Sequence, residues 1–342
     1  MGVDLGELFT KETCSYDDFH GRIIAIDAHN VLHQFLASIR QRDGTPLKDA
    51  QGRITSHLSG LLYRTANLVE AQIRPVYVFD GVPHPLKART LAQRRERKEQ
   101  AEKAWKEALE KGDLETARTK AQQTSRVTEE IIKLSKDLLQ ALGIPYIQAP
   151  SEGEAQASYM VKHHAAYAVG SQDFDCLLFG SPILIRNLTS SDRRKLPQKN
   201  AYTNVQIEMI RLHDGLKKIE LTQQQLIDIA ILIGTDFNEG VRGYGPKKSL
   251  QLIKKTGSLE KAFETIDVPD KPTPQEIEEI RNIFLQPPVI DDHSMKWSSP
   301  DTQAVLRILC DEHQFSRERI EPILQKYKGV DQISKQKNLF DF

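Results

Sequence analysis

The sequence has few cysteines, no long apolar run and no net charge. Its three cysteines, Cys14, Cys176 and Cys310, are scattered without a Cys-x-x-Cys pair. This pattern argues against a zinc site or a disulfide framework and fits a reducing compartment. No signal peptide precedes the chain's first motif, and no apolar run is long enough to span a membrane. These absences predict a soluble, intracellular protein.

Length and charge set broad limits. Lys and Arg total 47, Asp and Glu also total 47, and the chain has 342 residues. A net charge of zero does not exclude a nucleic-acid partner, because acidic residues elsewhere can offset a basic surface. The length suits one large domain, or one domain with a second, smaller domain.

Two pairs of carboxylates lie in the middle of the chain. Glu152 and Glu154 open a helix-length segment, and Asp173 and Asp175 follow a short apolar run at 166–169. Residues two apart in an extended chain point to the same side, so we expect both Asp side chains to face one point. Four converging carboxylates repel one another unless cations lie between them. Magnesium prefers such oxygen ligands.

A purely structural interpretation of this stretch stays open. Ser151 fits as the cap of a helix, with Glu154 completing a capping box, and an Asp after a strand is often a turn residue. Two other short apolar runs, however, also end in an acid, at Asp27 and Asp80. This repetition favours a metal site over helix caps.

Strands alternate with helices along the chain. Such alternation predicts an α/β fold with a mainly parallel central sheet and helices on both faces. Ligands of these sheets bind outside the carboxyl ends of the strands. All the acids named above are expected at that edge.

Residues 81–136 differ in composition from the segments before them. They are rich in helix formers, charges of both signs alternate, and Gly112 interrupts the pattern. From Lys87 to Lys106 the apolar residues are too few for a buried face, so this segment would stand in solvent or bridge to a partner. Lys87 and Arg94 are seven residues apart and would share a helical face. Since they follow an acidic strand end, we expect them to hold phosphates. A solvated helical hairpin is the alternative.

A second candidate phosphate site follows an apolar helix at 226–233. Gly243, Gly245, Lys247 and Lys248 lead into another helix. Free backbone N–H groups and lysines at a helix start attract anions. The arrangement resembles helix-hairpin-helix modules, which grip a duplex backbone without reading its sequence. A plain helix-loop-helix turn is the alternative. The basic stretch 190–200 is expected to be an exposed, solvated loop.

Seven motifs, taken in order, resemble the flap structure-specific endonuclease family: MGVDLGEL, IAIDAHNVLHQF, YVFDGVPHPLK, APSEGEAQASYM, VGSQDFDCLLFG, LIGTDFNEGVRGYGPKK and QKNLFDF. The match covers nearly the whole chain, and the ordered acid motifs are highly specific. The chain has no long basic tail after the last motif, which is similar to the archaeal branch.

The resemblance implies a PIN-like 5′-nuclease architecture, with a helical arch and a helix–two-turn–helix DNA-binding module. The implied regions are an N-terminal nuclease region at 1–98, the arch at 81–136, an internal nuclease region at 137–263 that includes the module at 221–263, a C-terminal helical region at 264–328 and a clamp-binding tail at 329–342.

The resemblance also implies a chemistry. It indicates a nuclease that cuts 5′ flaps at junctions with duplex DNA and has 5′-3′ exonuclease activity, in Okazaki fragment maturation and base excision repair. Two Mg²⁺ ions, with Mn²⁺ as a substitute, would generate the nucleophile and stabilise the leaving oxygen. The implied metal ligands form two groups: Asp27, Asp80, Glu152 and Glu154, and then Asp173, Asp175 and Asp236.

Other residues take roles from the same resemblance. Lys87 and Arg94 match arch residues that contact the scissile phosphate, so with Asp27, Asp80, Glu152 and Asp173 they form the implied catalytic set. Gly2 matches an N-terminus near the active site. Residues 243–248 match the module that also binds K⁺. His33 stands where the family usually has a Tyr that stacks on a terminal base, and imidazole offers a smaller face.

The tail and the cell compartment follow from the resemblance as well. Gln336 and Leu339 fit a peptide that binds the sliding clamp PCNA, but Phe340 and Phe342 are out of register and the chain stops there. The implied protein is a monomer that binds branched DNA and no membrane. It would be cytoplasmic and nucleoid-associated in an archaeon, or nuclear in a eukaryote.

Three alternatives remain beside flap cutting. One is a related exonuclease or bubble-cutting nuclease that uses the same acids. Another is a non-catalytic DNA-junction binder with a structural Mg²⁺, although binding alone does not need so many carboxylates beside a phosphate backbone. The third is an RNA-cutting relative of the same architecture.

Overall fold

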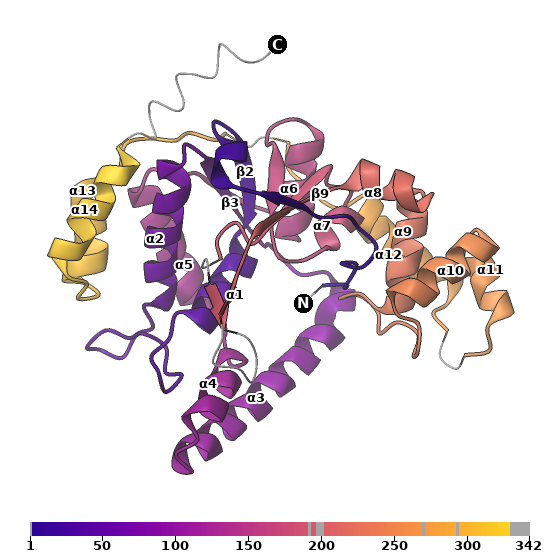
Figure 1. The fold of residues 1–342 in the computed structure, drawn as a ribbon, viewed down its shortest axis with the longest axis horizontal. Coiled ribbons are helices and arrows are strands. Elements are labelled where there is room, and N and C mark those ends of the chain that lie inside the picture. The colour runs from indigo at the N-terminus through magenta and orange to yellow at the C-terminus, as the bar shows by residue number, and fades with distance from the viewer. Residues whose placement is uncertain (1, 191–192, 196–201, 269–270, 292–293, 329–342) are drawn as a thin grey trace. The chain divides into compact units, whose positions relative to one another are not determined.

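A computed structural model describes residues 2–190, 193–195, 202–268, 271–291 and 294–328 (Figure 1). The chain forms two compact units. Unit 1 comprises residues 1–14, 80–91 and 148–291, and unit 2 comprises residues 15–79, 92–147 and 292–342. The predicted clamp-binding residues Gln336, Leu339, Phe340 and Phe342 lie outside the described residues.

Unit 1 contains four strands in the order β1-β9-β6-β5. They are β1 (Glu12–Cys14), β5 (Ala168–Gly170), β6 (Ile183–Arg186) and β9 (Ile207–Arg211). β5 and β6 are parallel, whereas β9 is antiparallel to both β6 and β1. A separate antiparallel pair joins β7 (Arg193–Lys195) to β8 (Tyr202–Asn204). Part of the stretch predicted to be a loop is therefore a strand.

The helices of unit 1 carry Lys87, Glu154, Asp175, Lys247 and Lys248 of the predicted site. They are η2 (Pro85–Lys87), α6 (Gly153–Lys162), α7 (Asp175–Leu178), α8 (Leu212–Ile219), α9 (Gln223–Ile233), α10 (Pro246–Thr256), α11 (Leu259–Thr265) and α12 (Pro274–Leu285). α9 is apolar on nearly all sides and is buried from residue 226 to residue 232. α10, α11 and α12 all pack against it (Figure 1).

Unit 2 is built on the parallel pair β2 (Ile23–Asp27) and β3 (Arg74–Phe79), in which Ile23 faces Arg74. Every residue of both strands is buried, as their β-branched apolar runs predict for parallel strands. β4 (Tyr146–Gln148) follows β3 in the strand order. The helices of this unit are η1 (Tyr16–Phe19), α1 (Ala28–Ser38), α2 (Ser56–Glu70), α4 (Leu114–Gln122), α5 (Glu129–Ala141), α13 (Thr302–Leu306) with a π-helical turn (Arg307–Asp311), and α14 (Arg317–Tyr327).

The prediction of an α/β fold with parallel central strands is confirmed. The antiparallel direction of β9 and β1 was not predicted, because the apolar pattern of a strand does not fix the direction in which it pairs. None of the helices in the described part of the chain is long and apolar enough to cross a bilayer.

The hairpin segment buries few side chains. α3 (Ala88–Glu110) begins in unit 1 and continues into unit 2, and Gly112 adopts a φ of +72° before α4. Ala101 and Ala108 of α3, with Ala117 and Ala121 of α4, are buried. Between Lys87 and Lys106 only Ala101 is buried, so this part of the segment has no wide buried face, as its composition predicts.

Candidate active site

Two of the predicted acids, Asp27 and Asp80, lie at the ends of strands, as expected from their positions in the sequence. Asp27 is the last residue of β2 and caps α1, since its Oδ1 accepts a hydrogen bond from the Asn30 N–H at 3.0 Å. Asp80 directly follows β3, and its Oδ1 accepts from the Gly153 N–H at 2.7 Å. The latter bond fixes Asp80 to the start of α6 within unit 1.

Two details of the acidic stretch differ from the sequence prediction. Ser151 does not cap α6, because the N-cap position belongs to Glu152 and no side chain there makes a capping bond. Asp175 is the first residue of the short helix α7, so it does not continue an extended strand from Asp173. The two aspartates are nevertheless neighbours, because the charge of Asp173 raises the pKa of Asp175.

Lys87 lies among the carboxylates. It ends η2, and its Nζ lies 2.5 Å from Glu152 Oε2 and 3.3 Å from Asp236 Oδ2. Burial disfavours the ammonium, but Glu152, Asp236 and Asp80 together hold the pKa of Lys87 above its ordinary value. Burial raises the pKa of Glu152, Lys87 opposes this, and the charges of Asp80 and Asp236 add to it. These side chains therefore form one cluster.

Asp175 lies at the crowded end of this cluster. Burial, followed by the charges of Asp173 and Asp236, raises the pKa of Asp175 to about 7. The Val3 N–H donates to Asp175 Oδ1 at 2.8 Å. A Cβ added to Gly2 would lie 2.4 Å from the same oxygen, so the chain near its N-terminus approaches this carboxylate too closely for any side chain.

Turn geometry places Asp236 after α9. Gly234 ends that helix with a φ of +107°, and a Cβ there would lie 2.7 Å from Glu239 O. The Thr235 hydroxyl donates to Asn238 Oδ1 at 2.8 Å, and the Phe237 N–H donates back to the Thr235 hydroxyl at 3.0 Å. The turn thus directs a buried carboxylate toward Lys87.

The donor set fits a hard divalent cation in its chemistry. All its ligand atoms are carboxylate oxygens, and the raised pKa values of Glu152 and Asp175 show that negative charge is confined there. Within the described residues, no three such side chains are already arranged as a ligand set. Magnesium tolerates this, because it keeps several waters and binds through few carboxylates. The ammonium of Lys87 occupies part of the same space.

Glu154 lies in the first turn of α6, and two side chains contact its carboxylate. The Ser171 hydroxyl donates to Glu154 Oε1 at 3.1 Å, and the Cys176 Sγ lies 3.5 Å from the same oxygen. Neither residue was singled out from the sequence. The signal that could have found them is their place on either side of the two aspartates of the same motif, with Ser171 before Asp173 and Cys176 directly after Asp175.

The remaining predicted residues of the catalytic region belong to unit 2. His33 lies on α1, where burial, followed by the nearby charge of Lys98, lowers its pKa to about 3. Its ring is therefore neutral near pH 7. Arg94 lies on α3, and its charge lowers the pKa of His33 as well. Lys87, in contrast, belongs to η2 and not to the helix that carries Arg94.

The predicted phosphate-binding loop leads into α10. Gly243 has a φ of +87°, Gly245 is the N-cap, and Pro246 occupies the first turn. A Cβ at either glycine would meet nothing within 4 Å, so the backbone is open to an approaching ligand. Lys247 and Lys248 are exposed, and Lys247 forms an ion pair with Glu7 at 3.3 Å.

A buried ion pair that was not predicted holds this module together. Arg281 of α12 donates from Nε to Asp228 Oδ1 of α9 at 2.8 Å, and its Nη1 bonds Glu260 of α11 at 2.5 Å. The bond from Arg281 lowers the pKa of Glu260 to about 2. The Leu259 N–H donates to Asp228 Oδ2 at 3.2 Å. An acid within an apolar helix was the available signal, because a buried charge needs a partner.

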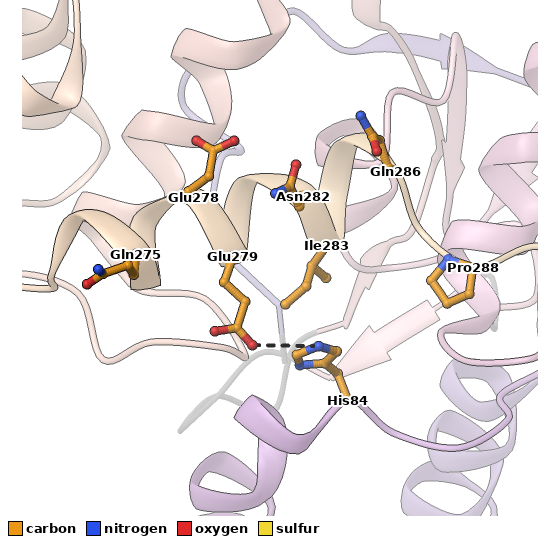
Figure 2. Close-up of a pocket in the computed structure, with 8 residues that line it drawn as sticks. All are labelled: His84, Gln275, Glu278, Glu279, Asn282, Ile283, Gln286 and Pro288. Atoms are coloured by element: carbon orange, nitrogen blue, oxygen red, sulfur yellow. Dashed lines mark ion pairs between the residues drawn. The ribbon is translucent and has the colours of Figure 1, made fainter.

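A groove of about 490 Å³ lies beside α12 (Figure 2). His84 lies on one side and faces Glu279 across 4.0 Å, and Ile283 and Pro288 also line the groove. The ring of His84 also packs edge-on against Phe237, with 6.1 Å between ring centroids. None of the predicted metal ligands lines this groove, so it is distinct from the carboxylate cluster.

Two family models match long segments of the chain. The model of the XPG N-terminal domain matches residues 6–101, and that of the XPG I-region matches residues 143–236. The chain is 50% identical to the flap endonuclease 1 of Thermococcus onnurineus over 340 residues, which cover 99% of this chain and 98% of that protein. It is 51% identical to the flap endonuclease 1 of Archaeoglobus fulgidus over 330 residues, or 96% and 97% of the two chains.

Two solved structures share the fold. The flap endonuclease-1 from Methanococcus jannaschii is 39% identical, with a TM-score of 0.75 over 98% of this chain and 99% of that one. The catalytic core of Rad2 in complex with a DNA substrate is 25% identical, with a TM-score of 0.69 over 94% and 97%. Because sequence identity near one half extends over the full length of both partners, the chain belongs to the flap endonuclease 1 family.

Proposed function

We propose that the protein is a structure-specific 5′-flap endonuclease, which hydrolyses a phosphodiester bond of DNA near the junction of single strand and duplex. The observation that carries this proposal is the cluster in which Glu152 and Asp236 pair with the ammonium of Lys87, while the charge of Asp236 also raises the pKa of Asp175. So much confined negative charge is unfavourable for a fold alone, and it suits a site that assembles cations against a phosphate.

The carboxylates would hold two Mg²⁺ ions, with Mn²⁺ as a substitute. Asp173, Asp175 and Asp236 would serve one ion, and Asp80, Glu152 and Glu154 the other, with Asp27 added from the family pattern. When bound, the metal supplies an activated water and neutralises charge on the phosphate. The protein's own part is to fix these oxygens, through the amides of Val3 and Gly153 and through the turn after α9.

Lys87 and Arg94 would stabilise the phosphate as its charge develops. Lys87 is held in place by its ion pairs before any substrate binds, so little reorganisation is needed at the moment of reaction. Its ammonium would exchange the carboxylate of Glu152 for a phosphate oxygen when DNA arrives. Arg94, further along the helical segment, would add a second positive charge.

The α9–α12 module would bind the duplex beside the junction. The open glycines before α10 and its exposed lysines provide amide donors and positive charge to the phosphate backbone without contacting bases. K⁺, as the family resemblance implies, would be held by the loop at 243–248 and would add positive charge beside the duplex backbone. Gly2 and His33 would contact the DNA near the cleaved strand. Specificity would then come from the shape and bendability of the junction.

The wider roles follow from flap cutting. The enzyme would act as a monomer in Okazaki fragment maturation and base excision repair, with 5′-3′ exonuclease activity on nicked duplexes. The tail would bind the sliding clamp PCNA through Gln336, Leu339, Phe340 and Phe342. In an archaeal cell it would work at the nucleoid.

One experiment tests the central claim. Asp173→Ala and the unchanged protein are compared for binding and cleavage of a 5′-flap duplex, in Mg²⁺ and in EDTA. We expect Asp173→Ala to lose cleavage by at least about 100-fold while binding stays near normal, since the aspartate acts on the reacting phosphate. Asp214→Ala, which removes an exposed carboxylate from α8, is the matched control and should cut normally.

The principal alternative is a junction binder that does not cut. It would require the unchanged protein to bind the flap in Mg²⁺ and leave it intact. A related exonuclease or bubble nuclease would instead cut nicked or bubble substrates faster than flaps, so both substrates belong in the same assay.

A further inference from the structure

Ser171 lies between Glu154 and the loop that carries Asp173. It follows β5 directly and is 4% exposed. Its own N–H donates to the Ile185 carbonyl of β6 at 3.2 Å, which anchors the residue to the sheet. Its hydroxyl donates to Glu154 Oε1 at 3.1 Å and accepts from the Asp173 N–H at 3.2 Å. One side chain thus contacts a carboxylate of α6 and the backbone of the aspartate loop.

The roles of the hydroxyl at these two contacts are fixed by chemistry. A backbone N–H can only donate, so the Ser171 oxygen must accept from Asp173. A carboxylate accepts, so the single hydroxyl proton must point to Glu154. The two bonds can therefore form together, and each favours the geometry that the other needs. Cys176 adds a weaker donor at 3.5 Å to the same oxygen of Glu154.

We propose that Ser171 is a positioning residue for metal loading, because it ties Glu154 to the loop that carries Asp173. The inference rests on the proposed function of these carboxylates as metal ligands. Without the tie, Glu154 would lose a donor that opposes its repulsion from the neighbouring acids, and the Asp173 loop would lose an anchor. Outer-shell partners of this kind typically change metal affinity or activity by about 10- to 100-fold.

The test compares three substitutions at position 171. Ser171→Ala removes the hydroxyl, Ser171→Cys keeps a weaker donor, and Ser171→Thr keeps the hydroxyl. Mg²⁺ binding to each DNA-free protein is measured by calorimetry. Single-turnover cleavage of a 5′ flap is then followed as a function of Mg²⁺ concentration. We expect Mg²⁺ affinity to fall by about 10- to 100-fold in Ser171→Ala, to fall less in Ser171→Cys and to be largely kept in Ser171→Thr.

Ser158→Ala is the matched control. Ser158 lies on α6, is fully buried and donates to the Cys176 carbonyl at 3.2 Å, a bond to backbone rather than to a carboxylate. It should lose a comparable buried hydrogen bond with no change in Mg²⁺ affinity. Flap binding in EDTA should be unchanged in every variant, and raising Mg²⁺ to saturation should restore most of the cleavage rate that Ser171→Ala loses at limiting Mg²⁺.

The outcomes distinguish a failure of the inference about Ser171 from a failure of the proposed function. If Ser171→Ala and Ser158→Ala lose thermal stability alike and both bind Mg²⁺ as the unchanged protein does, Ser171 is only a structural residue. If Ser171→Ala does not fold, the order of Ser171→Cys and Ser171→Thr still decides, and equal Mg²⁺ affinity in both would overturn the inference. If the unchanged protein neither binds Mg²⁺ nor cuts, the proposed function fails first.

Discussion

Two parts of unit 1 neutralise buried carboxylates in different ways. In the α9–α12 module, Asp228 is held by the guanidinium of Arg281, with Nε and Nη2 at 2.8 and 2.7 Å from one oxygen. In the carboxylate cluster, Glu152 and Asp236 share the ammonium of Lys87. Arginine is a rigid planar fork, whereas lysine is a point charge on a flexible stem. The first partner is suited to permanent structure, and the second to exchange with another cation or a phosphate.

The largest expected effect breaks the permanent pair. Arg281→Met leaves Asp228 buried and unpaired, so we expect the free energy of unfolding to fall by about 3–5 kcal/mol. Urea denaturation at pH 7 measures this loss. The double variant Arg281→Met with Asp228→Leu replaces both charges by apolar groups and should recover most of the stability. A double variant as unstable as the single one would mean that Arg281 contributes packing rather than charge compensation.

The second prediction breaks the exchangeable pair. Lys87→Met should reduce single-turnover flap cleavage by about 100- to 1,000-fold, because it removes a positive charge aimed at the reacting phosphate. Mg²⁺ affinity of the DNA-free protein should stay the same or rise, since the ammonium no longer competes for Glu152 and Asp236. Lys254→Met removes an equal charge that is paired with Glu220 at 3.1 Å and should change neither quantity. Weaker Mg²⁺ binding in Lys87→Met would refute the exchange.

The sequence predicted the exchangeable site far better than the permanent one. An acid at the end of an apolar run marks Asp80, because ligands of a parallel sheet bind at the carboxyl ends of its strands. Asp228 and Arg281, in contrast, are 53 residues apart and lie on separate helices. Periodicity shows that each helix has a buried face, but it does not show which buried charges meet.

Local sequence patterns gave wrong predictions where contacts between distant residues determine the structure. Ser151 and Glu154 have the spacing of a capping box, yet α6 begins at Gly153, where the amide donates to Asp80. The partner of that amide comes from a distant strand end, so no local pattern could reveal it. Ser171 was overlooked for the same reason, since its role depends on Glu154 of another element.

The third prediction concerns the close approach of the chain to Asp175. Gly2→Ala adds a Cβ that would lie 2.4 Å from Asp175 Oδ1, so the carboxylate or the N-terminal segment must shift. A shift of about 1 Å at a reacting centre can cost up to about 100-fold in rate, and we expect a loss of about 10- to 100-fold in kcat. Gly52→Ala is the control: its Cβ meets nothing within 4 Å, so kcat should stay unchanged although a φ of +82° costs the variant some stability. An unaffected Gly2→Ala enzyme would show that Asp175 tolerates movement.

The smallest expected effect distinguishes the two ends of α10. Lys248 lies in its first turn and is exposed, whereas Lys254 lies in its last turn beside Glu220. If the helix start binds the duplex, Lys248→Ala should weaken binding by only a few fold and reduce the salt slope by about 1, because one phosphate contact is lost. Lys254→Ala should leave the slope unchanged. Fluorescence anisotropy of a labelled flap in EDTA, repeated from low to moderate salt, measures both, and equal slopes in the two variants would place the duplex elsewhere.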